Sequence, residues 1–309
     1  MYRWQSMLGK FEHKREQITF HGETVEYPGL PPGASIGNLI CDQRFSGGSI
    51  EGKVRFKEIG ASSSCQFIVS YQPITNAFLA AGIGSDAMFV IRTFNGSTWT
   101  YHSAGGDRSS LVADRDYLIK VYVIGSRLTL TVDGVEVRVT NLPFTLPLNQ
   151  VGIWCQDAND IYIKDYCVTA EPPMAFVVMQ FTKPYNELYS EVIQPICEEF
   201  GISAIRADET YAPGIIITDI ARQITEARLV VAEITPANPN VYYEVGYSHA
   251  LNKPTILIAE KGTDLPFDVS PFRVLFYENS IEGKRRVEEG FRKHLTALQA
   301  APGLTVSSS

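Results

Sequence analysis

The hydrophobic pattern of this chain changes its period at one place, the proline-containing segment at residues 169–173. Before this segment, apolar residues occur at every second position, as in LTLTV at 128–132, which is typical of strands that bury one face. After it, a continuous apolar run at 174–181 is followed by stretches in which apolar residues recur at every third or fourth position. A period of two builds sheets and a period near 3.6 builds helices, so the sequence predicts two domains of different class, 1–170 and 171–309.

The first domain is predicted to be an all-β sandwich. Short strand-like runs follow one another with turn residues between them, and no helical spacing separates them,. Within the run at 117–139, Asp133-Gly134 supplies the residue pair that tight hairpins favour. The runs lie at 51–59, 65–72, 87–94, 117–139 and 161–168.

The order of these runs resembles the concanavalin-like jelly-roll modules of the laminin-G and glycoside-hydrolase-like group. The resemblance is carried by YLIKVYVIGSRLTLTVDGVEVRV at 117–139 and by VGIW at 151–154. A glycosidase needs two carboxylates that face each other across a groove, and no compact acidic cluster occurs at 36–168. We therefore expect a sensor, binding or assembly module whose trigger, a carbohydrate or a protein, the sequence does not identify. The residues that could stack on a sugar, or instead fill the sandwich, are Trp99, Tyr101 and Trp154,.

The second domain is predicted to be an open parallel sheet with helices on both faces. Apolar strand-like runs alternate with helical stretches along its length, and this alternation is typical of α/β folds. Ligands in such sheets bind beyond the carboxyl ends of the strands, so the loops after Phe181, Asp208 and Thr235 are the predicted mouth of a site. The strands are expected at 174–181, 202–208, 228–235, 255–260 and 274–278, and the helices at 186–202, 214–227, from 239 onward and at 283–298.

The helix that begins near residue 239 carries a carboxylate close to this mouth. Asn238 is a favourable N-cap, and Pro239 suits the first helical position because it has no N–H to leave unpaired,. Glu244 therefore lies within two turns of the helix start, and Tyr243 and Tyr247 are its neighbours. A carboxylate at this place is the first candidate for a catalytic group.

These segments together resemble the bacterial TIR-like domains that are related to nucleoside 2-deoxyribosyltransferases. The resemblance covers residues 174–278 and rests on NPNVYYEVGYSHALNKPTILI at 238–258, preceded by DIARQITEARLVVAEIT at 219–235. It implies a flavodoxin-like fold and an activity that cleaves an N-glycosidic bond, of NAD or of a nucleoside, with a helix glutamate at the sugar. By position that glutamate is Glu244.

The chemistry agrees with one carboxylate at the sugar. Cleavage of NAD between ribose C1′ and nicotinamide builds positive charge on C1′, and nicotinamide leaves as a neutral molecule without needing a proton. A carboxylate beside C1′ can stabilise that charge or form a covalent intermediate. A neutral nucleoside base would instead need a proton donor, and Asp208 and Glu233 are available for that role, so both chemistries remain open.

The resemblance implies further substrate contacts, each with a structural alternative. Arg206 can pair a pyrophosphate or form a surface ion pair, and Asn238 can bind a ribose hydroxyl or act only as the helix cap. The segment 209–215 corresponds to the loop that controls access and self-association in TIR domains. The substrate-binding candidates are Gln180, Phe181, Arg206, Asp208, Glu233, Asn238, Asn240, Tyr243 and Tyr247.

The composition of the chain limits which partners and which cellular location we expect for the protein. A net charge of −7 argues against a nucleic-acid partner,. Five cysteines without a CxxC pair predict free thiols in a reducing compartment,, and no apolar run could span a membrane. We therefore expect a cytoplasmic protein, a homo-oligomer as the resemblance implies, with NAD as substrate, no tightly bound cofactor and no metal site.

The leading expectation is an NAD-cleaving TIR-like effector, placed in antiphage defence by analogy alone. The first alternative is a (deoxy)ribosyltransferase or hydrolase that acts on nucleosides or nucleotides. The second is a module without catalysis that binds a nucleotide or another copy of itself.

Overall fold

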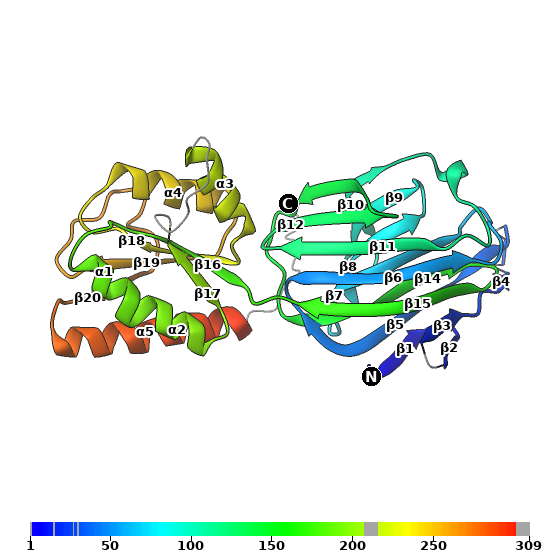
Figure 1. Ribbon diagram of the computed structural model, residues 1–309, viewed down its shortest axis with the longest axis horizontal. Coiled ribbons are helices and arrows are strands. Elements are labelled where there is room, and N and C mark those ends of the chain that lie inside the picture. The colour runs from blue at the N-terminus through cyan, green and yellow to red at the C-terminus, as the bar shows by residue number, and fades with distance from the viewer. Residues whose placement is uncertain (1, 15, 27, 30, 207–215, 301–309) are drawn as a thin grey trace.

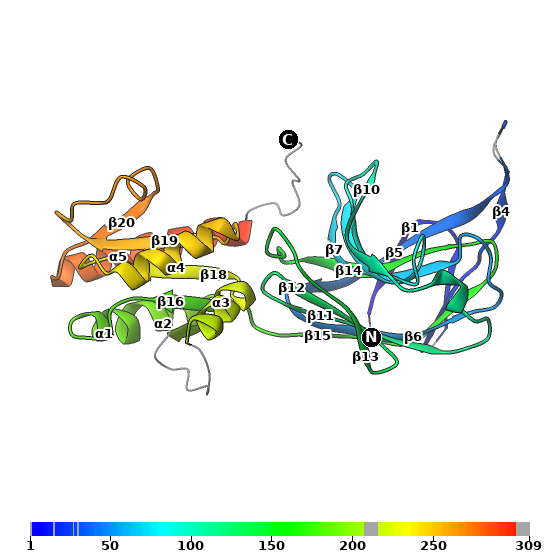
Figure 2. The same cartoon turned by 90° about the horizontal axis from the view of Figure 1, so that it is seen from above.

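The computed structural model describes residues 2–300 except 15, 27, 30 and 207–215. Up to Ala170 the chain forms two antiparallel sheets that face each other, and from Met174 it forms a parallel sheet covered by helices. The two parts lie end to end, joined by residues 171–173 (Figures 1 and 2). The chain therefore combines a jelly-roll-like β-sandwich with a smaller α/β part.

Sheet A of the sandwich follows the order β1-β5-β14-β7-β8-β9-β10, with β4 beside β5, and sheet B follows β13-β12-β11-β6-β15-β3-β2. The strands of sheet A are β1 (Trp4–Leu8), β4 (Thr24–Val25), β5 (Gly33–Phe45), β7 (Ser64–Gln72), β8 (Ala77–Gly84), β9 (Phe89–Phe94), β10 (Trp99–Gly105) and β14 (Asn149–Asp157). Those of sheet B are β2 (Phe11–Lys14), β3 (Gln17–Phe20), β6 (Gly48–Phe56), β11 (Tyr117–Ile124), β12 (Arg127–Val132), β13 (Val135–Asn141) and β15 (Ile161–Ala170).

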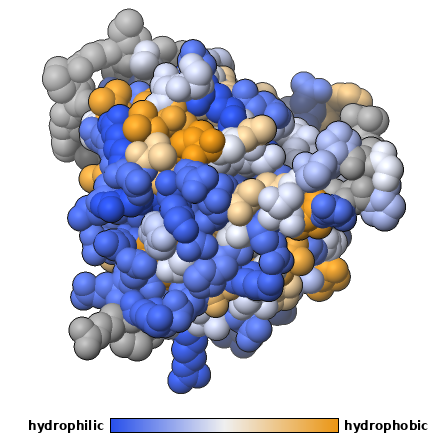
Figure 3. Space-filling model, turned by 90° about the vertical axis from the view of Figure 1, so that its right-hand side faces the viewer, coloured by the Kyte–Doolittle hydropathy of each residue, from blue (hydrophilic) through white to orange (hydrophobic). Residues whose placement is uncertain are grey.

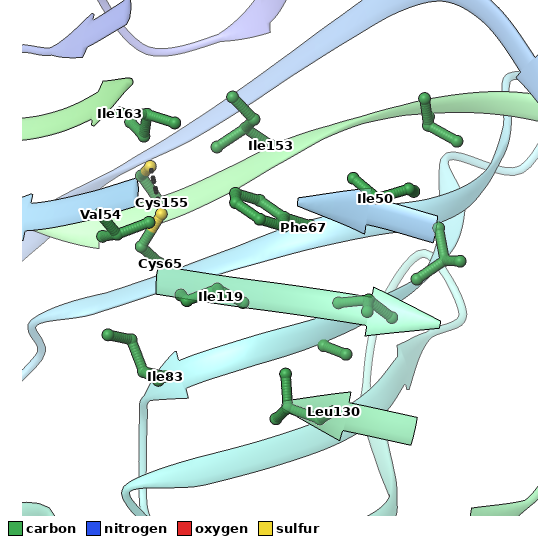
Figure 4. Close-up of a cluster of buried hydrophobic side chains, with 14 of the residues drawn as sticks. Ile50, Val54, Cys65, Phe67, Ile83, Ile119, Leu130, Ile153, Cys155 and Ile163 are labelled. Atoms are coloured by element: carbon green, nitrogen blue, oxygen red, sulfur yellow. Dashed lines mark hydrogen bonds between the residues drawn. The ribbon is translucent and has the colours of Figure 1, made fainter. Parts of the chain in front are cut away.

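The main core lies between these sheets, where apolar side chains of both meet. Figure 4 shows Phe67 of sheet A near Ile50 and Ile119 of sheet B. The cysteine thiols are free, as the sequence predicts; those of Cys65 and Cys155 are buried side by side in this core, 3.8 Å apart. Seen end on, the sandwich surface is largely hydrophilic, with hydrophobic residues gathered in a few groups (Figure 3).

The strands expected from the period-two pattern are confirmed, and so is the hairpin turn between β12 and β13. Asp133 and Gly134 have φ angles of 51° and 82°, and two adjacent left-handed residues are what this turn type requires. The predicted runs did not include β1 to β5, β8 or β10. Trp4–Leu8 and Phe11–Lys14 are mostly exposed, so their residues show no alternation between buried and exposed positions that a sequence pattern could reveal.

The parallel sheet follows the order β17-β16-β18-β19-β20. Numbered within this part, that order is 2-1-3-4-5, the flavodoxin-like arrangement. Helices α3 and α4 cover one face, and α1, η2, α2 and α5 cover the other (Figure 1). The strands are β16 (Met174–Val178), β17 (Ser203–Arg206), β18 (Leu229–Glu233), β19 (Thr255–Glu260) and β20 (Val274–Tyr277). The helices are α1 (Tyr185–Leu188), the π-helical turn η2 (Tyr189–Ile193), α2 (Gln194–Glu199), α3 (Ile216–Glu226), α4 (Pro239–Ala250) and α5 (Ile281–Ala300).

The predicted alternation of strands and helices is therefore confirmed, with one difference. The helix expected at 186–202 contains a π-helical turn directly before Gln194 and Pro195. Proline has no N–H to donate to the carbonyl four residues earlier, and this missing bond favours a local change of helix type at that point.

The sandwich and the α/β part touch where the turn Gly125-Ser126 meets the last turn of α3. The backbone N and the Oγ of Ser126 each lie 3.2 Å from the carbonyl oxygen of Thr225. The buried Lys253 donates to the same oxygen at 2.5 Å and to the carbonyl of Ala227 at 2.7 Å. Carbonyls at the end of a helix lack partners within it, and the Thr225 carbonyl takes its hydrogen bonds from Lys253 and from Ser126 of the sandwich.

We expect Gly125→Ala to open this contact and Gly134→Ala to leave it closed. Both glycines sit in two-residue turns with positive φ, 59° and 82°, so both substitutions carry a similar backbone cost. A Cβ at Gly125 would lie 2.3 Å from the carbonyl oxygen of Glu226, whereas one at Gly134 meets nothing within 4 Å. Amide exchange in the last turn of α3 should accelerate only in the Gly125 variant. Equal exchange in the two variants would contradict this account.

Candidate functional site

Helix α4 begins where the sequence predicts. Asn238 has an extended backbone, with φ −124° and ψ 118°, and its side-chain oxygen accepts a hydrogen bond from the N–H of Asn240 at 3.0 Å. Pro239 follows as the first helical residue. This geometry gives Asn238 a structural role as N-cap. The side chain of Asn240 is exposed beside it.

Glu244 lies on the buried side of α4 and is only 7% exposed. It shares that side with Val241, Val245 and Ser248. Among the residues that the structure describes, none forms a hydrogen bond or an ion pair with its carboxylate. Burial raises the pKa of Glu244 to about 7. A buried carboxylate without a partner costs stability, and such groups are found preferentially at functional sites.

Glu233 ends β18 and is 1% exposed. Its Oε1 accepts a hydrogen bond from the hydroxyl of Tyr277 at 3.2 Å, and its Oε2 accepts one from the N–H of Thr235 at 3.1 Å. Burial raises the pKa of Glu233 to about 8, although these hydrogen bonds act against that shift. Its side chain shares a face with Leu229 and Val231, the face opposite α4. The structure thus does not place Glu233 on the face that carries Glu244.

Arg206 and Phe181 come together at the ends of β17 and β16. The guanidinium carbon lies 5.3 Å from the ring centre of Phe181 and 4.8 Å from that of Tyr189. Nη1 of Arg206 donates to the side-chain oxygen of Asn186 at 2.8 Å. Gln180 is half-buried and donates to the hydroxyl of Thr182 at 3.0 Å. A cation and an aromatic ring, which is 45% exposed, therefore lie together at the edge where parallel sheets bind ligands.

The tyrosines near Glu244 are placed differently from one another. Tyr243 is 55% exposed, and Tyr247 is half-buried against the sheet. The sequence interpretation missed Tyr242, which packs on the same cluster and whose hydroxyl oxygen is buried without a partner in the described part of the chain. Its spacing of three from Val245 is the signal that could have placed it on the sheet side. Asp208 and the segment 209–215 lie outside the described residues.

A hollow of about 380 Å³ in the α/β part lies on the opposite face from α4. It is lined by residues of α1, η2, β20 and the start of α5, including Glu187, Glu191 and Tyr277. Glu244 does not line it. The hollow is therefore separate from the candidate catalytic carboxylate.

Within the described residues, no three His, Cys, Asp or Glu side chains are grouped as metal ligands. No helix of that part of the chain is long and apolar enough to cross a membrane.

No family model and no curated protein matches this sequence. A carbohydrate-binding module from Bacillus subtilis matches at 12% identity with a TM-score of 0.44, over 53% of this chain and 92% of that chain. A prokaryotic β-1,3-1,4-glucanase derived from a mouse hindgut metagenome matches at 12% identity with a TM-score of 0.38, over 53% and 90%. A Bacillus licheniformis β-glucanase matches at 11% identity with a TM-score of 0.36, over 54% and 92%. Each of these three similarities covers about half of this chain.

Proposed function

We propose that residues 174–278 form a TIR-like domain that cleaves NAD between nicotinamide and ribose, with Glu244 as the carboxylate at C1′. The observation that supports this most directly is the burial of Glu244 without a partner among the described residues. A protein gains no stability from such a group. Its position near the start of α4, beside the ligand-binding edge of a parallel sheet, favours a role in chemistry.

In this proposal the ionised Glu244 faces the sugar as the C1′–N bond breaks. Positive charge develops on C1′ and the ring oxygen, and a desolvated carboxylate stabilises it more strongly than one in water. Nicotinamide leaves neutral, so no acid has to protonate it. Phe181 can stack on a base and Arg206 can pair a pyrophosphate. A water molecule then bonds to C1′ and loses a proton to solvent, which gives ADP-ribose; if a nitrogen of the adenine bonds to C1′ instead, the product is the cyclised form.

The test is to incubate the purified full chain with NAD and to measure nicotinamide by chromatography, with and without conditions that promote oligomers. Release of nicotinamide supports the proposal. Exchange of the base with free purines, without loss of NAD, would assign the domain to the nucleoside transferase alternative. Nucleotide binding without turnover in every preparation would leave only the non-catalytic alternative.

The rate of cleavage is expected to rise with pH through about 7. Glu244 acts as an anion, and burial raises its pKa to about 7, so below that pH most molecules carry it protonated and inactive. Initial rates between pH 5.5 and 8.5 should fall on the acid side with an apparent pKa near that value. Thermal melts over the same range control for unfolding. A rate that does not change across this range would contradict an ionised Glu244.

A further inference from the structure

Sheet A carries a second cluster of buried side chains, on the face turned away from sheet B. Along β14, Ile153 and Cys155 belong to the core between the sheets, and Trp154 between them points to the other side,. The same alternation places Phe78 of β8 and Phe94 of β9 on that outer face. These aromatic side chains therefore do not fill the core of the sandwich.

The outer face is hollowed among these aromatic side chains. A hollow of about 160 Å³, called the aromatic hollow below, is lined by Phe78, Phe94, Trp99 and Trp154 and by the amides of Asn38 and Asn76. Leu8 and Ile36, which are 56% and 37% exposed, complete its lining. This volume is smaller than that of pockets that enclose a whole drug-sized ligand. The aromatic hollow is large enough for one six-membered ring of a ligand, and the rest of such a ligand would lie outside it.

Asn38 brings to the aromatic hollow a buried polar atom without a partner among the described residues. Its side chain is 4% exposed, and its Oδ1 has no hydrogen-bond partner among the described residues. The oxygen of Asn76, in contrast, accepts a hydrogen bond from the hydroxyl of Tyr71 at 3.3 Å. A buried amide atom without a partner costs free energy. A ligand hydroxyl that donates to Asn38 would remove that cost.

The guanidinium of Arg92 packs against both Trp99 and Trp154. Its guanidinium carbon lies 3.7 Å from the ring centre of Trp99 and 4.7 Å from that of Trp154. It is 3% exposed, and its Nε and Nη1 donate to Gln66 at 3.0 Å and to the hydroxyl of Tyr101 at 3.1 Å. Because these contacts already hold the two tryptophan rings in place, the rings lose little conformational entropy when a ligand binds. Arg92 does not line the aromatic hollow, and no Asp, Glu, Lys or Arg does.

We propose that the aromatic hollow binds one neutral sugar ring, the terminal unit of a glycan. The C–H face of a pyranose stacks on tryptophan, and one of its hydroxyls donates to Asn38. An uncharged lining offers no partner to a phosphate or a carboxylate, and an acyl chain would leave Asn38 unpaired. Because no carboxylate lines the aromatic hollow, the ring is bound and not cleaved.

The test titrates the full chain with methyl glycosides of glucose, galactose, mannose, fucose and N-acetylglucosamine, in both anomeric forms, and follows tryptophan fluorescence and saturation-transfer NMR. At least one glycoside should bind. Asn38→Leu keeps a similar volume without the amide, so it should weaken that binding about tenfold or more without lowering Tm. Trp99→Ala should abolish the fluorescence change. Asn141→Leu, an exposed amide at the end of β13, is the matched control and should bind as the unaltered chain does.

Three results would overturn the proposal: no glycoside of the set binds, Asn38→Leu binds as tightly as the unaltered chain, or adenosine displaces the sugar signal from the same tryptophans. The last result would assign the aromatic hollow to a nucleoside. Sugar binding does not depend on NAD cleavage, so a Glu244→Gln chain should bind the same glycoside with unchanged affinity.

Discussion

Glu244→Gln is expected to lower nicotinamide release from NAD by at least about 100-fold, because removal of one preorganised electrostatic group from an active site typically costs roughly 3 kcal/mol or more. Glutamine has nearly the shape of glutamate but carries no charge, so it fits the buried side of α4 and cannot stabilise the positive C1′. The measurement is the initial rate at pH 8, where the carboxylate of the unaltered chain is mostly ionised, since burial brings its pKa to about 7.

The matched control for this experiment is Glu191→Gln. Glu191 lies on η2, on the other face of the sheet, and its carboxylate is 2.9 Å from Nζ of Lys284. This exposed pair contributes little to stability, so the control should retain full activity. The Glu244 variant should melt no earlier than the unaltered chain at pH 8, because it no longer buries a charge. If Glu244→Gln keeps the rate of the unaltered chain, the assignment of this residue is wrong.

Patterns among neighbouring residues in the sequence are sufficient to predict much of the fold. The period change at 169–173, the Asp133-Gly134 turn and the Asn238 cap each depend on a few neighbouring residues, and all three correspond to features of the structure. Short exposed strands such as Trp4–Leu8 lack a buried face, so no period distinguishes them from loops.

The site depends more on contacts between distant residues. Glu233 and Tyr277 are 44 residues apart and meet because β18 and β20 lie in the same sheet. The sequence shows that Leu229, Val231 and Glu233 share a face, but not which helices cover it. The sequence offered Glu233 only as an available proton donor, and the structure turns its side chain toward the helices of the face opposite α4.

The aromatic hollow illustrates the same limit within the sandwich. In β14 the inward Ile153 and the outward Trp154 are both apolar and both buried, so alternation alone does not show which faces the core. That Trp154 lies near Trp99 and Asn38 follows only from the strand order of sheet A. The sequence left both stacking on a sugar and burial in the sandwich open, and burial is the commoner explanation for such aromatic residues.

The second large effect is expected from Glu233→Gln, which should flatten the dependence of stability on pH. In the folded chain burial raises the pKa of Glu233 to about 8, from the ordinary glutamate value of 4.5 that applies to the unfolded chain. Below about pH 4.5 the group is protonated in both states. Between 4.5 and 8 the unfolded chain releases this proton while the folded chain keeps it. The free energy of unfolding therefore falls as pH rises through this window.

The size of this effect is on the order of a few kcal/mol, since each unit of pKa shift corresponds to about 1.4 kcal/mol. Glutamine does not ionise, and its amide can still accept from Thr235 and donate to Tyr277, so the variant should lose much less stability between pH 5 and pH 8. Urea unfolding of both chains at these two pH values measures the difference. Glu278→Gln is the control, because that carboxylate is exposed and its hydrogen bond with Lys261 lowers its pKa. Parallel pH curves for the unaltered chain and Glu233→Gln would show that Glu233 is already ionised in the folded protein, and its contacts with Tyr277 and Thr235 would then have to stabilise an anion.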